Sequence, residues 1–184
     1  MSREDAAPDR PPITAIVYED GRVFEGLLRD ATDAMIVAGL SLAGLLQQSN
    51  LRLGRQKCDM VLHDLATGVL HPISEDRGPG AQGCSLDRDS FVRACMAAGA
   101  GLTERTSCLV LCKFGKMEVE GGGVRMLIEA ALERGVPVWI GVSQGNLVPF
   151  RAFAGALARE ISIADMASTV RLLLSERSAV EASH

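Results

Sequence analysis

Short apolar runs alternate with amphipathic stretches along most of the chain, which predicts strands and helices in turn. The run ITAIVY at Ile13–Tyr18 is rich in β-branched residues, as is typical of a strand buried on both faces. After the Asp20-Gly21 turn, apolar residues recur at helical spacing over residues 22–38, and Gly39 stands where a helix would end. The same reading predicts strands at 40–47, 108–112 and 136–142, a helix capped by Ser85 or Asp87, a helix over 122–134, and two helices from there to the end.

Two further apolar runs, residues 59–65 and 69–74, flank Ala66-Thr67-Gly68 and predict a hairpin. Strands that alternate with helices predict an α/β fold, here a three-layer sandwich around a mainly parallel sheet that carries the antiparallel hairpin. The polar, proline-rich residues 1–12 predict a disordered tail. We therefore expect a single domain over 13–178 and a C-terminal tail over 179–184.

Parallel sheets of this type bind ligands beyond the carboxyl ends of their strands. That rule selects the loops at 19–22, 47–57, 113–118 and 143–146 as candidates. The Gly- and Pro-rich residues 74–83 are placed to fold over them.

Composition and charge exclude several function classes. The net charge of −4 and the pI near 5.4 argue against a nucleic-acid partner held by bulk positive charge. The most apolar stretch, residues 34–46, contains two glycines and is too short to span a membrane. The N-terminus lacks an apolar signal segment, so we expect a cytoplasmic protein. The five cysteines form no C-x-x-C pair, and no metal site is expected.

Two segments carry a resemblance to a known family. They are CDMVLHDLATG at residues 58–68 and LVLCKFGKME at residues 109–118. In this order they resemble the small P-loop nucleoside-triphosphatases typified by a thermophile enzyme and its human cancer-related counterpart. The chain is most similar to a bacterial branch of uncharacterised proteins, some of which are encoded beside molybdate-transport genes. The resemblance implies a P-loop NTPase-like fold.

The residues that carry hydrolysis in that family are replaced here. A phosphate loop needs G-x-x-x-x-G-K-[ST] after the first strand, whereas this chain has VYEDGRVFEGLL at residues 17–28. Where the family has Asp-Glu to hold magnesium and activate water, this chain has Cys112-Lys113. A thiol suits magnesium poorly, and the lysine places a positive charge where the metal would lie. We therefore expect degenerate Walker A and Walker B motifs without conventional NTP hydrolysis.

The altered edge instead predicts a site for a small anion. The resemblance places Arg22, Lys113 and Lys116 near one rim, and cations beside a helix N-terminus attract anions. The leading hypothesis is a binding protein for an oxyanion such as molybdate, or for a nucleotide-like ligand, with no catalytic residue and no cofactor assigned. The predicted ligand-binding residues are Arg22, Arg77, Gly78, Gly80, Gly83, Lys113, Lys116 and Glu118.

Several alternatives remain open at this point. Lys113 and Lys116 are equally typical of solvated turn residues that pair with nearby carboxylates, and Glu118 of a residue that starts a helix. Lys113 would lower the pKa of the Cys112 thiol in an enzyme with an unconventional site. A third possibility is a ligand-free interaction module, such as a homodimer joined through the hairpin. His63 and His71 lie on that hairpin, where we expect them to be cross-strand neighbours rather than metal ligands.

Overall fold

The computed structural model describes residues 11–51, 58–75 and 86–181. Within these residues seven strands form one sheet, in the order β4-β3-β2-β5-β6-β1-β7. The strands are β1 (Ile13–Tyr18), β2 (Leu42–Leu51), β3 (Cys58–Asp64), β4 (Leu70–Pro72), β5 (Cys108–Phe114), β6 (Val138–Ser143) and β7 (Ala158–Ser162).

Five neighbouring strands run parallel to one another. β2 pairs with β5, β5 with β6, β6 with β1 and β1 with β7, all in parallel. β3 pairs antiparallel with β2, and β4 antiparallel with β3, so the predicted hairpin forms one edge of the sheet. The predicted fold class is therefore confirmed.

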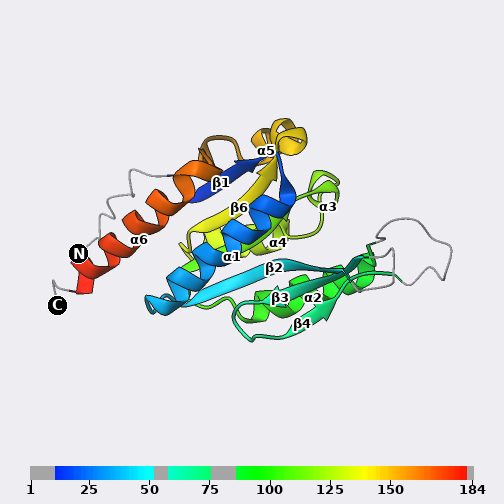
Figure 1. Ribbon diagram of the computed structural model, residues 1–184, viewed down its shortest axis with the longest axis horizontal. Helices are drawn as coiled ribbons and strands as arrows, with labels where there is room; N and C mark the ends of the chain where they lie inside the picture. Colours follow the sequence, from blue (N-terminus) through cyan, green and yellow to red (C-terminus); the bar gives the residue numbers. More distant parts are fainter. Residues whose placement is uncertain (1–10, 52–57, 76–85, 182–184) are drawn as a thin grey trace.

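Helices cover both faces of the sheet (Figure 1). α1 and α6 pack against each other on one face, and α2 and α4 against each other on the opposite face. The helices are α1 (Gly21–Val37), α2 (Arg88–Ala100), α3 (Lys116–Val119), α4 (Arg125–Glu133), α5 (Leu147–Ala154) and α6 (Met166–Glu181). Three short 3-10 turns complete the chain, namely η1 (Gln144–Asn146), η2 (Gly155–Leu157) and η3 (Ile163–Asp165).

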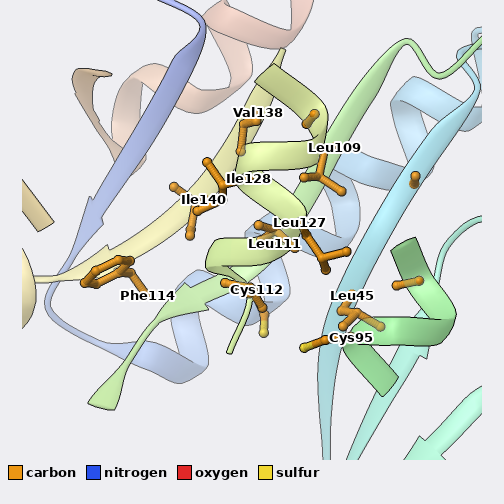
Figure 2. Close-up of a cluster of buried hydrophobic side chains, with 14 of the residues drawn as sticks. Leu45, Cys95, Leu109, Leu111, Cys112, Phe114, Leu127, Ile128, Val138 and Ile140 are labelled. Atoms are coloured by element: carbon orange, nitrogen blue, oxygen red, sulfur yellow. The ribbon is translucent and has the colours of Figure 1, made fainter. Parts of the chain in front are cut away.

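Each face of the sheet has its own apolar cluster. Beneath α1, the side chains of Phe24, Leu28 and Met35 are buried against Trp139 and Val110 of the central strands. The other cluster joins α2 and α4 to the same strands, and Figure 2 shows Leu109, Leu111, Leu127 and Ile128 within it. Each such large side chain stabilises the fold by roughly 1.5–3 kcal/mol when it leaves water.

The start and end of α1 follow from local chemistry. The Asp20 side chain caps the helix, and Gly39 follows its end with φ 81°, a conformation that glycine adopts without steric cost. Phe24, Leu28 and Met35 recur at helical spacing and form the buried face.

The structure differs from the sequence-based expectation near the C-terminus. Residues 158–162 form β7, paired with β1, where the sequence pattern predicts part of a helix. β2 continues to Leu51, into the stretch predicted as a loop. α6 reaches Glu181, so the tail predicted from 179 begins inside this helix. Residues 1–10 and 182–184, the rest of the predicted tails, lie outside the described residues.

Candidate functional site

The carboxyl ends of β1, β5 and β6 bring three of the predicted loops to one edge of the sheet. β1 leads into the N-terminus of α1, β5 into the loop that contains α3, and β6 into η1. The Asn146 side-chain amide donates to the Phe114 carbonyl over 3.0 Å and so joins the last two loops. This edge is where ligands bind in parallel α/β sheets.

The N-terminus of α1 is closed by its own cap. The Asp20 carboxylate accepts hydrogen bonds from the backbone N–H groups of Arg22 and Val23, at 2.8 and 3.2 Å. In a phosphate loop, N–H groups at this position are directed at the ligand. Here they are engaged by a carboxylate, so α1 offers no phosphate cradle of that kind.

A bulge in β5 decides where Lys113 points. Leu111 pairs with Ile140 and Phe114 with Val142, so that Cys112 and Lys113 together lie opposite Gly141. As a result Cys112 and Phe114 are both buried in the cluster beneath α2 and α4, while Lys113 between them is exposed. Lys113 therefore extends toward the α1 face of the sheet.

The missing side chain of Gly141 makes room for this arrangement. A Cβ atom at position 141 would lie 2.4 Å from the Phe24 ring and 2.5 Å from the Cys112 carbonyl oxygen. Phe24 in turn stacks on Tyr18, with ring centroids 4.4 Å apart. The bulge and the first turns of α1 are thus packed against each other.

Cations from α1 and β5 interact electrostatically with one carboxylate, and we call the four residues the Glu25 cluster: Arg22, Glu25, Arg29 and Lys113. Burial raises the pKa of Glu25, while Lys113, Arg29 and Arg22 act in the opposite direction. Three cations and one carboxylate give a formal charge of +2. Among the described residues no ion pair within 4 Å engages these four side chains. Two of the predicted site residues, Arg22 and Lys113, thus act on the same carboxylate, and so does Arg29.

Lys116 and Glu118 serve a different arrangement. Glu118 is 2% exposed, and its two carboxylate oxygens accept from the N–H groups of Gly115 and Val124, both at 2.8 Å. Lys116 is solvent-exposed and lies 3.8 Å from the Glu120 carboxylate. These contacts give Glu118 the helix-starting role and Lys116 the surface pairing that the sequence left as alternatives.

The remaining predicted ligand residues, Arg77, Gly78, Gly80 and Gly83, lie outside the described residues.

A groove of about 760 Å³ lies on the other side of β1, between the ends of β1 and β7. Its charged walls are Glu19, Asp20, Glu160 and Arg151, and the Arg151 guanidinium is held by Glu160 in a bidentate pair at 2.7 and 2.8 Å. Three carboxylates against one paired cation repel an anion. The groove therefore does not extend the Glu25 cluster.

Residues 13–169 match the family described as "Protein of unknown function (DUF2478)". The chain belongs to this family. It is also 28% identical over 158 residues to "Molybdenum import ATP-binding protein ModC 2" of Bradyrhizobium diazoefficiens. That alignment covers 85% of this chain and 18% of the relative, so the chain spans less than a fifth of the relative's length. No solved structure matches the chain.

This DUF2478 chain has a sheet that is compatible with a P-loop-like fold, as the resemblance implies and as the distant similarity to an ATP-binding protein supports. The described residues include no helix that is long and apolar enough to cross a membrane.

Cys112 contradicts the expectation of an activated thiol. Its side chain is buried beside that of Cys95 in the cluster of Figure 2. Burial raises the pKa of Cys112 to about 11, and the neighbouring Lys113 offsets only part of this effect. Burial likewise raises the pKa of Cys95 to about 12. A thiol that stays protonated at neutral pH is a poor nucleophile, so the prediction of a lowered pKa is wrong.

The two hairpin histidines do not face each other. His71 pairs with Leu62, and His63 pairs with Leu70, so the two imidazoles lie on opposite faces of the sheet. The expectation that His63 and His71 are cross-strand neighbours is therefore wrong, because each lies opposite a leucine. Over the described parts of the chain, no group of three His, Cys, Asp or Glu side chains is arranged to hold a metal ion.

Two members of the cluster, Arg29 and Glu25, are not among the site residues that the sequence predicts. Arg29 lies four residues after Glu25 on α1, and this i, i+4 spacing was the available signal. The electrostatic interaction of Glu25 with Lys113 spans 88 positions, the difference between 113 and 25. Neither helical spacing nor the strand pattern can reveal an interaction over that separation.

Proposed function

We propose that this DUF2478 chain binds a small oxyanion at the Glu25 cluster and does not hydrolyse nucleoside triphosphates. The observation that carries the proposal is that three cations, Arg22, Arg29 and Lys113, act on one carboxylate in the first turns of α1. They exceed the charge of the carboxylate that they surround. Guanidinium and ammonium groups that converge in this way bind oxyanions by charge-assisted hydrogen bonds.

The size of the ligand follows from what the edge lacks. A nucleoside triphosphate needs a row of free backbone N–H groups for its phosphates, and the Asp20 carboxylate engages those of Arg22 and Val23. The β5 end offers Cys112 and Lys113 where magnesium would need carboxylates. A tetrahedral oxyanion needs neither feature, and a few convergent cations suffice to hold it.

The relative supports a particular version of this proposal. Its name places it in molybdenum import, and this chain is similar to less than a fifth of it. We propose that the DUF2478 chain recognises molybdate or a similar dianion on the cytoplasmic side of such a system.

Calorimetric titration at constant ionic strength tests the proposal. Molybdate, tungstate, sulfate, phosphate and ATP are compared, with sodium chloride as the control for screening. We expect heat and saturation with one or more of the tetrahedral oxyanions and no turnover of ATP with magnesium. Well-folded protein that binds none of them contradicts oxyanion binding, and steady ATP turnover contradicts the absence of hydrolysis.

A homodimer through the hairpin is a second candidate, favoured by a separate observation. β4 is the outermost strand of the described sheet and has only three residues, and the apolar side chains of Val69 and Leu70 at its start are 49% and 55% exposed. Light scattering tests it with Leu70→Glu. A dimeric wild type and a monomeric variant would support the candidate, and a monomeric wild type would contradict it.

A further inference from the structure

We infer that Glu25 is an internal competitor for the oxyanion, so that ligand binding is coupled to the uptake of a proton by this carboxylate. The inference rests on the proposed function and assigns a regulatory group to its site. It predicts a protein that binds its ligand more tightly as the solution becomes more acidic.

The geometry places Glu25 among the cations that would hold the ligand. Arg22, Glu25 and Arg29 follow one another at spacings of three and four residues, so they lie along one side of α1. The β5 bulge turns Lys113 toward the same side. An oxyanion that contacts Lys113 and the α1 arginines therefore lies beside the Glu25 carboxylate.

The titratable groups of the neighbouring strands that interact with Glu25 are neutral at physiological pH. Tyr18 at the end of β1 interacts with Glu25, Cys112 of β5 does so from the opposite face of the sheet, and burial raises the pKa of each. On its own helix and on β5, Glu25 otherwise meets the cations already named, Arg22, Arg29 and Lys113. Glu25 is thus the negatively charged member of this set, and burial raises its pKa.

The surroundings make protonation of Glu25 accessible. The carboxylate is partly withdrawn from water, and this burial outweighs the three cations and raises its pKa. A bound dianion adds a like charge and occupies the cations that favour ionised Glu25. Both effects raise the pKa of Glu25 further in the complex, and a pKa that rises on binding requires proton uptake. By the same linkage, protons strengthen binding.

Calorimetry in pairs of buffers with different ionisation enthalpies measures the proton directly. Sulfate and molybdate are the probes, because each is a dianion between about pH 6.5 and 8, so that the measured proton uptake belongs to the protein. For the wild type we expect uptake of up to about one proton per ligand, and an affinity that falls by up to about tenfold per pH unit above the pKa of free Glu25.

Glu25→Gln isolates the carboxylate, and Glu120→Gln is the matched control on the Lys116 side. We expect Glu25→Gln to bind about tenfold more tightly than wild type near pH 7.5 and without proton uptake, since one unit of pKa linkage corresponds to tenfold in affinity. Glu120→Gln should keep the pH dependence of the wild type. Thermal unfolding of each variant confirms that it is folded.

The possible failures are distinguishable. Wild-type binding without proton uptake, or a Glu25→Gln variant with unchanged affinity and pH dependence, overturns the role of Glu25 and leaves oxyanion binding intact. If neither the wild type nor Glu25→Gln binds sulfate or molybdate, the proposed function fails and this inference fails with it.

Discussion

Two carboxylates lie near the same edge of the sheet, and their surroundings differ. Glu118 is almost fully buried, and two backbone N–H groups satisfy its two oxygens. Glu25 is partly buried, no hydrogen bond engages it within the described residues, and cations surround it at longer range. The first arrangement fixes a loop. The second arrangement leaves charged groups without close partners at an edge of the sheet where ligands bind. Such groups are candidates for a functional site.

Loss of the Glu118 carboxylate should have the largest effect on stability. In Glu118→Gln the side-chain amide must direct its NH₂ group at one of the two N–H donors, Gly115 or Val124. A buried charge-assisted hydrogen bond is lost and a donor is left unsatisfied. We expect the free energy of unfolding in urea to fall by about 2–4 kcal/mol.

Glu120→Gln is the control for that measurement, since it removes a charge from the exposed pair with Lys116. Its cost should stay within about 0.5 kcal/mol. Equal effects of the two substitutions would contradict the structural role of Glu118.

Gly123 gives a second way to break the same loop, with a smaller effect. Its φ is 62°, and a Cβ atom there would lie 1.9 Å from a Glu118 carboxylate oxygen. We expect Gly123→Ala to lower the free energy of unfolding by about 1–3 kcal/mol.

A double mutant sharpens the assignment of that cost. If the clash with Glu118 is its cause, Gly123→Ala should cost less in a Glu118→Gln background than in the wild type. Strict additivity of the two effects would show that backbone strain at position 123 acts alone.

Glu25→Gln should have the smallest effect on stability, and in the opposite direction. Burial raises the pKa of folded Glu25 above the unfolded value of 4.5, so native protein binds the proton more tightly than unfolded protein. The resulting stabilisation is fully present below pH 4.5 and is lost as the pH rises through the folded pKa. At pH 7 the variant should therefore melt about 1 °C higher than wild type, a gap that closes toward pH 4.5.

Thermal unfolding across this pH range checks the sign. A variant that melts lower than wild type at pH 7 would mean that the cations stabilise ionised Glu25 more than burial penalises it.

The sequence pattern predicted the strands and helices correctly where the local signals are strong. The β-branched run at Ile13–Tyr18 is an interior strand, and Asp87, one of the two predicted caps, caps α2. β7 was missed because its sequence, AREIS, places polar residues in an edge strand that is only partly buried. Such a strand lacks the apolar run that marks the interior strands.

The candidate site was predictable in part. Lys113 and Arg22 were found from their positions at element ends, because parallel strands share a carboxyl edge. The bulge that directs Lys113 toward the α1 face forms opposite Gly141 of the neighbouring strand β6. No local pattern in the β5 sequence reveals this pairing. Glu118 was assigned to the ligand because its position matches a family motif, whereas its hydrogen bond to Val124 closes a loop that only the folded chain shows.

Lys113 in the β5 bulge and Lys116 at the start of α3 allow the most direct test of oxyanion binding. Lys113→Gln and Lys116→Gln each remove one positive charge, from the Glu25 cluster and from the pair with Glu120 respectively. In calorimetric titrations with molybdate and sulfate at one ionic strength, we expect Lys113→Gln to weaken binding about tenfold or more, and Lys116→Gln to stay within about twofold of wild type. Equal losses in the two variants, or unchanged binding in Lys113→Gln, would contradict an oxyanion site at the Glu25 cluster.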